Sequence, residues 1–359
     1  MTQSERDKAD NGAPLGEATT RHEERILCAV GKGTNARPEL SASESLCGAG
    51  VLFLLPALIS QGLLKTKEVY QLPPSDYYGV ESIVLTLAFM ALSRIKNPEQ
   101  LKLCKPGEIG RLIGLGRIPE MKCLRQKVKL LSDQQQTARL NNSLIDIWYP
   151  QEEQSEADFL YIDGHVRIYY GYQANLPSKF ISRQKLCLSA TSEFWVNDAK
   201  GMPVMMVMGE LTEKLQAVIE GQIIGRLLEA KLISNDVGLA EKPQCTLVFD
   251  REAHEPAFFA RLWEKYRVAI LTYRKNVKDK WCDKTFENTV VTVMEQKINM
   301  DLCEKKVELG GYVFREVRRL SQNGHQTAII ANNPILQAKE VAGRMFARWS
   351  QENFFRYLI

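Results

Sequence analysis

One stretch of the chain, residues 158–272, combines strand and helix patterns in a fixed order, and this order limits the folds open to it. Its first part is rich in aromatic and β-branched residues, which favour strands. Strands are therefore expected at residues 158–170, 183–196 and 203–208. Because consecutive strands usually pair with one another, we expect these three to form an antiparallel meander.

The second part of this stretch predicts a helix and then a deeply buried strand. Residues 212–231 carry an apolar residue at every fourth position, which indicates a helix with one buried face. That face is formed by Leu215, Ile219, Ile223 and Leu227. Residues 244–250 are almost continuously apolar, as in a strand covered on both sides. With a helix from Pro256 and a strand at residues 268–272, the order predicts an α/β fold, a mixed sheet flanked by helices.

The length of 359 residues exceeds that of one ordinary domain, so further units are expected around this stretch. Residues 1–40 are polar and show no hydrophobic period, which predicts a disordered tail. Residues 41–150 are predicted to be helical, and residues 155–359 to form the α/β domain. Short strands with glycine turns predict a β-rich insertion at residues 276–332, before a last helix at residues 334–357.

Two short helices with a glycine turn between them are predicted around residue 115. Residues 105–113 form the first helix, and Pro119 suits the first turn of the second. The second helix has one apolar face at three- and four-residue spacing. This face is made of Met121, Leu124, Val128 and Leu131. Two short helices joined in this way are typical of a helix-turn-helix.

Positive charge is concentrated around these helices, although the net charge of the whole chain is only +4. Residues 94–129 hold ten Lys or Arg and three Glu, which is a local net charge of +7. Clustered cations bind DNA by releasing its counterions, so we expect Lys122, Arg125 and Lys127 to contact the phosphate backbone. The alternative is an ordinary solvated helical face.

Cysteine usage and hydropathy argue against a secreted or membrane protein. The eight cysteines include no C-x-x-C pair, and the N-terminal region has no secretory signal. The most apolar run, residues 49–64, is shorter than the roughly 20 residues of a membrane span, and Pro56 interrupts it. We therefore expect a cytoplasmic protein that does not associate with membranes.

Three carboxylates lie on elements of the predicted α/β domain that the fold is expected to bring together. Asp163 lies in the first strand, Asp250 ends the strand after the long helix, and Glu352 lies in the last helix. Each alone is more often a structural or surface acid, but the fold is expected to gather them. Clustered carboxylates repel one another unless cations bind, and oxygen ligands suit Mg²⁺ or Mn²⁺. All three are predicted to hold a pair of divalent ions that activates a water or a DNA 3′-hydroxyl for phosphodiester displacement.

The segments around these acids resemble the motifs of DDE-type insertion-sequence transposases. The segments are YIDGHVR (161–167), VFDREAHEP (248–256) and RWSQENFFRY (348–357). The resemblance covers about residues 41–359 and implies a ribonuclease H-like catalytic core split by a β-rich insertion, with a separate DNA-binding N-terminus. It implies Mg²⁺-dependent cleavage and strand transfer at transposon ends. It also implies a homo-oligomer on paired terminal inverted repeats, in a bacterial, nucleoid-associated protein.

The third motif departs from the Tyr-x2-Arg-x3-Glu-x6-Lys signature of related members. Arg348 and Glu352 keep the Arg-to-Glu spacing, but Met345 and Ile359 stand at the Tyr and Lys positions. The resemblance implies that Arg348 contacts a DNA phosphate near the active site. The chain ends seven residues after Glu352 with apolar residues on an unfinished helical face. This ending predicts that a C-terminal segment is missing, which leaves open whether this copy is an active enzyme or an inactive remnant.

Three further cations are candidates for DNA contacts. Arg251 adjoins Asp250, and Arg274 and Lys275 follow the strand that ends at residue 272. The alternatives are a local salt bridge for Arg251 and a solvated loop for the other two. A DNA transposase is the leading hypothesis for the chain. The alternative hypotheses are a metal-dependent nuclease that does not join DNA ends and a catalytically inactive, DNA-binding remnant.

Overall fold

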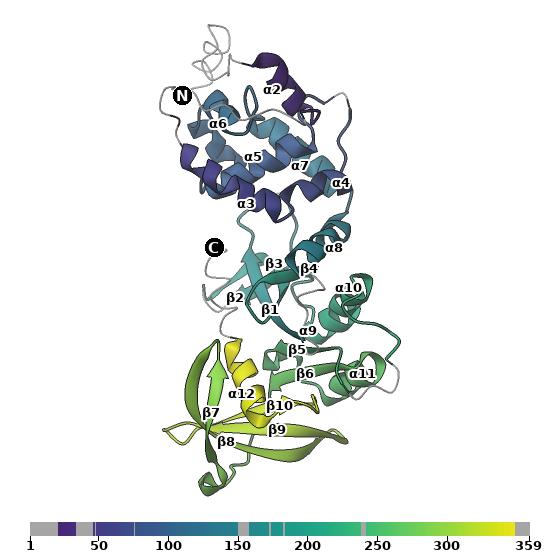
Figure 1. Ribbon diagram of the computed structural model, residues 1–359, viewed down its shortest axis with the longest axis vertical. Helices are drawn as coiled ribbons and strands as arrows, with labels where there is room; N and C mark the ends of the chain where they lie inside the picture. The colour runs from purple at the N-terminus through teal and green to yellow at the C-terminus, as the bar shows by residue number, and fades with distance from the viewer. Residues whose placement is uncertain are drawn as a thin grey trace. The chain divides into compact units, whose positions relative to one another are not determined.

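The computed structural model describes residues 21–33, 46, 48–74, 76–149, 158–171, 174–181, 184–237 and 242–348 (Figure 1). The chain forms two compact units, residues Met1–Ile147 and Trp148–Ile359. In the described part of the chain, no single helix has the length and hydrophobicity of a membrane span. Two helical segments separated by a 61° bend, Ala49–Ser60 and Leu63–Val69, reach those criteria only together.

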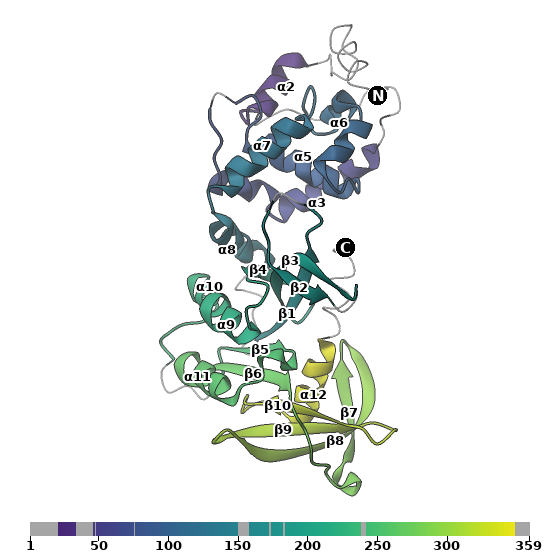
Figure 2. The ribbon, with the colours of Figure 1, turned by 180° about the vertical axis from the view of Figure 1, so that it is seen from behind.

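The described part of the first unit is built from short helices (Figures 1 and 2). They are α2 (His22–Ala29), η1 (Ala49–Phe53), α3 (Leu55–Ser60), η2 (Leu63–Lys65), α4 (Thr66–Val69), α5 (Val80–Leu92), η3 (Pro98–Leu103), α6 (Pro106–Leu112), α7 (Met121–Ser132) and α8 (Thr137–Trp148). Most of α5 is buried, as expected for a helix that is apolar on nearly all faces. Pro56 lies in the first turn of α3, so it begins a helix instead of kinking one.

Helix α2 lies within residues 1–40, which the composition had predicted to be a disordered tail. That prediction is wrong for His22–Ala29, because tertiary contacts hold this segment. The Ala29 side chain is fully buried, and the Ala29 carbonyl accepts hydrogen bonds from the Ser82 hydroxyl (2.7 Å) and the Gly79 N–H (2.8 Å). A short segment in a polar region of the sequence can therefore still be ordered by contacts with a neighbouring helix.

Helices α6 and α7 occupy the places of the two helices predicted around residue 115. The turn between them passes close to α6, since a Cβ added at Gly110 would lie 2.7 Å from the Arg117 Cα. The predicted apolar face of α7 is only partly right. Leu124 is fully buried, but Val128 is 38% exposed and Lys127 is only 8% exposed. The buried face of α7 therefore includes Lys127 instead of Val128. The Lys127 side chain forms an ion pair with Asp76.

The second unit contains one ten-stranded sheet. Its strands are β1 (Asp158–Ile168), β2 (Ser178–Ile181), β3 (Leu186–Asn197), β4 (Pro203–Gly209), β5 (Cys245–Phe249), β6 (Val268–Tyr273), β7 (Glu287–Val293), β8 (Gln296–Leu309), β9 (Tyr312–Leu320) and β10 (Gln326–Ala331). The strand order is β2-β3-β1-β5-β6-β10-β9-β8-β7, and β4 pairs with β3. The pairs β1–β5 and β5–β6 are parallel and the others are antiparallel, which confirms the predicted mixed sheet and α/β class.

The predicted β-rich insertion continues this sheet. Strand β10 pairs with β6, so β7 to β10 extend the same hydrogen-bonded surface. Gly310 and Gly311 form the tight connection between β8 and β9 with φ values of 58° and 82°. Positive φ at both central residues is what a two-residue hairpin of this type requires, and glycine adopts it without steric cost.

The helix predicted at residues 212–231 contains a wide turn at its centre. It consists of α9 (Leu215–Val218), a π-helical turn η5 (Ile219–Ile223) and α10 (Ile224–Glu229). A strict four-residue spacing of apolar side chains drifts around an α-helix, which has 3.6 residues per turn. The π turn widens the helix locally, so the four predicted apolar residues all remain buried.

Helices cover the two faces of the parallel strands (Figures 1 and 2). Phe249 of β5 contacts Phe258 and Phe259 of α11 (Pro256–Tyr266), with ring centroids 6.5 and 6.1 Å apart. Val248, one residue earlier, belongs to a core cluster with α12 (Ala338–Ala347) on the other face. Successive residues of a strand point to opposite faces, so β5 is buried on both, as its composition predicts.

A buried ionic network anchors the segment after β6 to the extended part of the sheet. Both oxygens of the fully buried Glu316 accept from arginine, Oε1 from Arg318 Nε and Oε2 from Arg274 Nη1, each at 2.5 Å. Arg318 Nη2 also donates to Asp279 Oδ2 at 2.7 Å, and the Arg318 guanidinium lies 4.1 Å from the centroid of the Trp281 ring. Two carboxylates thus balance two arginines; Glu316 and Arg318 are fully buried, whereas Asp279 is about half exposed.

Replacing Glu316 with Gln should destabilise the second unit strongly. The change leaves the guanidinium groups of Arg274 and Arg318 in a buried place with one fewer negative charge. Breaking a buried ion pair in this way costs about 3–5 kcal/mol of unfolding free energy. Urea unfolding measures this loss, and Glu308→Gln on the exposed side of β8 is the control, with an expected change within about 0.5 kcal/mol. Equal stabilities of the two variants would contradict the role given to the network.

Candidate functional site

The two described acids of the predicted triad occupy neighbouring positions on adjacent parallel strands. The register of β1 and β5 pairs Tyr161 with Val248 and Ile162 with Phe249. The residues that follow this pair are Asp163, still within β1, and Asp250, directly after β5. Paired strands lie about 4.8 Å apart, so the fold brings these carboxylates to the same edge of the parallel pair.

The two carboxylates also share a face of the sheet. Tyr161 and Val248 belong to the core cluster that packs under α12. Asp163 and Asp250 follow these residues by two positions, and both keep an extended backbone. Alternation along a strand therefore directs both side chains toward the α12 side.

Backbone hydrogen bonds hold each carboxylate in place. Asp163 Oδ1 accepts from the N–H of Gly164 at 3.0 Å, and Asp250 Oδ1 accepts from the N–H of Arg251 at 2.7 Å. Asp250 is the N-cap residue of the short helix η6 (Arg251–Ala253), which directs the chain away from the sheet. The two acids are thus fixed locally by the residues that follow them.

Arg348, at the end of α12, reaches the same place. Its Nη1 lies 3.8 Å from Asp163 Oδ2, and its side chain is 13% exposed. One turn earlier, the Arg344 carbonyl accepts from the Tyr161 hydroxyl at 3.1 Å, and the Arg344 guanidinium lies 4.3 Å from the Phe159 ring centroid. Helix α12 therefore runs beside β1, and its last described turn approaches Asp163.

Glu352, the third predicted ligand, lies outside the described residues. Among the residues that are described, no cluster of three or more His, Cys, Asp or Glu side chains is arranged to hold a metal ion. The described part of the candidate site therefore consists of Asp163, Asp250 and Arg348. Trp195, which is partly buried, is the residue of β3 that pairs with Asp163.

His254 is a site neighbour that the sequence analysis did not single out, although it stands in the VFDREAHEP segment. Its ring packs edge-on against Phe259, with centroids 5.6 Å apart, and its backbone N–H donates to the Arg251 carbonyl at 3.1 Å. Burial lowers the pKa of His254, and the nearby charges of Lys275 and Arg274 lower it further. A neutral imidazole therefore packs beneath the turn that carries Asp250.

The predicted DNA-contacting cations of the second unit differ in their surroundings. Arg251 is exposed beside Asp250. Lys275 is also exposed, and its Nζ donates to the Glu252 carbonyl at 3.3 Å. Arg274 is 18% exposed and serves the ion pair with Glu316. Contact with DNA stays a prediction for all three, but Arg274 already has a structural role.

The predicted cations of α7 are divided in the same way. Lys122 and Arg125 are exposed, and Arg125 pairs with Glu99. Lys127 is buried and pairs with Asp76 inside the first unit. Lys122 and Arg125 thus keep the position expected of phosphate contacts, whereas Lys127 has a structural ion pair.

The second unit is an α/β structure with a mixed sheet, in which Asp163 within β1 and Asp250 directly after β5 occupy neighbouring positions. A family model described as "Transposase protein" matches residues 16–359, so the chain belongs to this transposase family. Membership of the family implies DNA as a partner. No curated protein matches the chain.

The lowered pKa of His254 predicts that stability depends on pH. A histidine whose pKa is lower in the folded state binds fewer protons when folded, so its stabilising effect is complete above the unfolded pKa of about 6.5 and is lost as the pH falls below it. Between pH 7.5 and pH 5, the wild-type chain should lose more unfolding free energy than His254→Gln, as measured by urea titration. His325→Gln, at an exposed position, is the control and should behave as wild type. Identical losses in all three proteins would exclude this role of His254.

Proposed function

We propose that this chain is a DDE-type DNA transposase, which cleaves the ends of a transposable element and joins them to target DNA with the aid of Mg²⁺ or Mn²⁺. The observation that carries the proposal is the neighbouring placement of Asp163, within β1, and Asp250, directly after β5, with Arg348 beside Asp163. Neighbouring carboxylates suit the binding of hard cations.

The arrangement of the sheet supports a ribonuclease H-like core for the proposed enzyme. A meander of three antiparallel strands, β1, β3 and β4, is extended by β5 and β6, which run parallel to β1. Helices α11 and α12 lie on opposite faces of this part of the sheet. The first acid then stands in the first strand and the second acid follows β5, as the proposed class requires.

Asp163, Asp250 and Glu352 are the residues proposed to hold the divalent ions. The proposal for Glu352 rests on its spacing, because it follows Arg348 by four residues and a continued helix would place the two on one face. When bound, a pair of divalent ions polarises a water or a DNA 3′-hydroxyl and stabilises the leaving oxygen. The backbone N–H groups of Gly164 and Arg251 orient the two aspartates for this task.

Arg348 has a proposed role in binding a DNA phosphate. Its guanidinium is largely buried beside Asp163, and at 3.8 Å this ion pair is a loose one. Among the described residues, the Nε of Arg348 has no hydrogen-bond partner. An arginine held in this way presents planar donors that match the oxygens of a phosphate, once Asp163 engages a cation.

DNA binding by the first unit is proposed through the exposed cations of α7. Lys122 and Arg125 lie on the solvated side of this helix, next to the turn from α6. Phosphate contacts of this kind add affinity without sequence specificity and weaken as salt rises. Assembly as a homo-oligomer on paired element ends completes the proposal.

Alanine at each of the three acids should abolish strand cleavage and leave DNA binding intact. Loss of a direct ligand should lower the cleavage rate by more than roughly a hundredfold, since changes to groups that only support metal ligands already cost about 10–100-fold. Cleavage of a labelled element end with Mg²⁺ measures Asp163→Ala, Asp250→Ala and Glu352→Ala, and a gel-shift assay checks binding. Asp236→Ala, at an exposed position of the second unit, is the control. Cleavage that persists in any of the three variants would remove that residue from the site, and cleavage without end joining by the wild type would favour a nuclease.

Glutamine at Lys122 or Arg125 should reduce the salt dependence of DNA binding. Each lost phosphate contact lowers the slope of log affinity against log salt by about 1. The slope is obtained from fluorescence anisotropy at several salt concentrations. Lys127→Gln is the matched comparison, because loss of its buried pair with Asp76 should lower stability without this change of slope. An unchanged slope for both Lys122→Gln and Arg125→Gln would separate α7 from DNA binding.

A further inference from the structure

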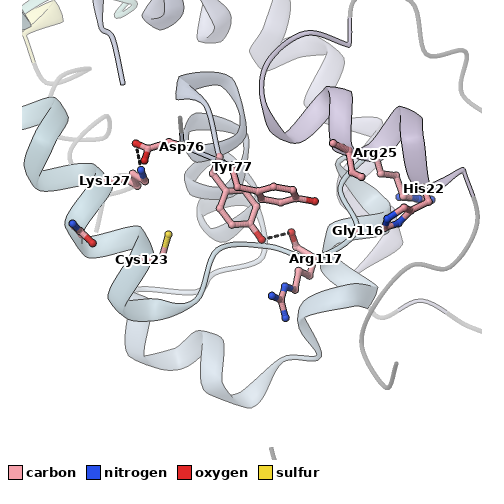
Figure 3. A pocket seen from close by; sticks show the side chains of 11 residues that line it. His22, Arg25, Asp76, Tyr77, Gly116, Arg117, Cys123 and Lys127 are labelled. Carbon is pink, nitrogen blue, oxygen red and sulfur yellow. Dashed lines mark hydrogen bonds and ion pairs between the residues drawn. The ribbon is translucent and has the colours of Figure 1, made fainter. Parts of the chain in front are cut away.

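The first unit contains a cavity of about 580 Å³ between α2, the loop before α5 and the start of α7 (Figure 3). It is lined by His22, Arg25, Asp76, Tyr77, Arg117 and Lys127, among others. Small-molecule sites in proteins have volumes of roughly 300–1,000 Å³, so this cavity has the size of a site for one nucleotide. A duplex is far too large to enter it.

Positive charge dominates the cavity. Among the described residues that line it, Arg25, Arg117 and Lys127 are cationic and Asp76 is anionic. Asp76 is already engaged with Lys127. Burial lowers the pKa of Arg25, and the nearby charges of Arg111 and Arg21 lower it further, so cations are crowded here. An anion entering the cavity would relieve this repulsion.

The arginines of the cavity are held by backbone contacts. Arg25 Nη1 donates to the Leu115 carbonyl at 2.9 Å, which ties α2 to the turn before α7. The Arg117 carbonyl accepts from the Tyr78 hydroxyl at 3.0 Å. The Arg25 side chain is therefore held by the turn that joins α6 and α7, and the Arg117 backbone is held within the same turn.

Two tyrosines supply an aromatic wall. The Tyr78 ring is buried and stands edge-on to the Tyr77 ring, with centroids 4.9 Å apart and an interplanar angle of 87°. Tyr77 is 44% exposed and lies between the Asp76–Lys127 pair on one side and Arg25 and His22 on the other (Figure 3). The ring of Tyr77 thus packs against the buried Tyr78 ring and remains accessible to a ligand.

We propose that this cavity binds one unpaired nucleotide of a DNA substrate, with its base against Tyr77 and its phosphate between Arg25 and Arg117. The combination of an aromatic ring and adjacent cations matches the two parts of a nucleotide, since bases stack on aromatic rings and phosphates pair with arginine. The inference rests on the proposed function, because it requires that the turn before α7 lies close to DNA.

The test compares three labelled DNA probes with the full chain. They are a blunt duplex, the same duplex with an unpaired thymine overhang, and the same overhang made of abasic residues. Tyr77→Ala should weaken binding of the thymine overhang about tenfold, the effect of losing one stacked base, and leave the blunt duplex unaffected. Tyr77→Phe keeps the ring and should restore wild-type affinity. Arg117→Gln should weaken both overhang probes, since it acts on the phosphate.

Two controls make the result decisive. Lys96→Gln removes an exposed cation outside the cavity and should affect all three probes equally. Thermal unfolding of each variant verifies the fold, and Tyr77 is exposed enough to be replaced without loss of the core. Blunt-duplex binding together with no selective effect of Tyr77→Ala would overturn this inference alone. Failure of the wild-type chain to bind any of the duplexes would overturn the proposed function and the inference with it.

Discussion

The parallel pairing of β1 with β5 is the constraint on which the second unit depends. These strands are separated by about 80 residues of sequence, yet their register places Asp163 and Asp250 side by side at one edge. A shift of this register by one residue would turn one carboxylate to the opposite face of the sheet. The register is held by burial, because Val248 and Phe249 pack against helices on opposite faces and neither can exchange sides.

Helix α12 completes the site because it is tied to β1 at successive turns. The Tyr161 hydroxyl and the Phe159 ring contact Arg344, and Arg348 then approaches Asp163. The ionic network around Glu316 lies in the part of the sheet beyond β6 in the strand order. There it joins the segment after β6 to β9. The contacts of α12 with β1 and the network around Glu316 both use arginine, whose planar guanidinium makes several directed contacts at once.

Sequence periodicity predicted much of this arrangement, and its failures have identifiable causes. Residues 244–250 were expected to form a strand covered on both faces, and β5 is one. Lys127 was expected on the exposed face of α7, but Asp76, from a distant loop, draws it into the interior. A pattern of apolar residues cannot reveal a buried ion pair, because its partner lies elsewhere in the chain. For the same reason α2 was missed, since its order depends on contacts with α5.

The sequence by itself determined the α/β class and the order of strands and helices, because these follow from local periodicity. It also supplied the three acids that are proposed as ligands. The transposase family could likewise be inferred from three short segments, and the family match agrees. Only the tertiary structure decided which cations are exposed and which are paired, where Arg348 lies, and that a cationic cavity with an aromatic wall forms in the first unit. These features arise between residues that are far apart in the chain, where burial and long-range pairing outweigh any local pattern.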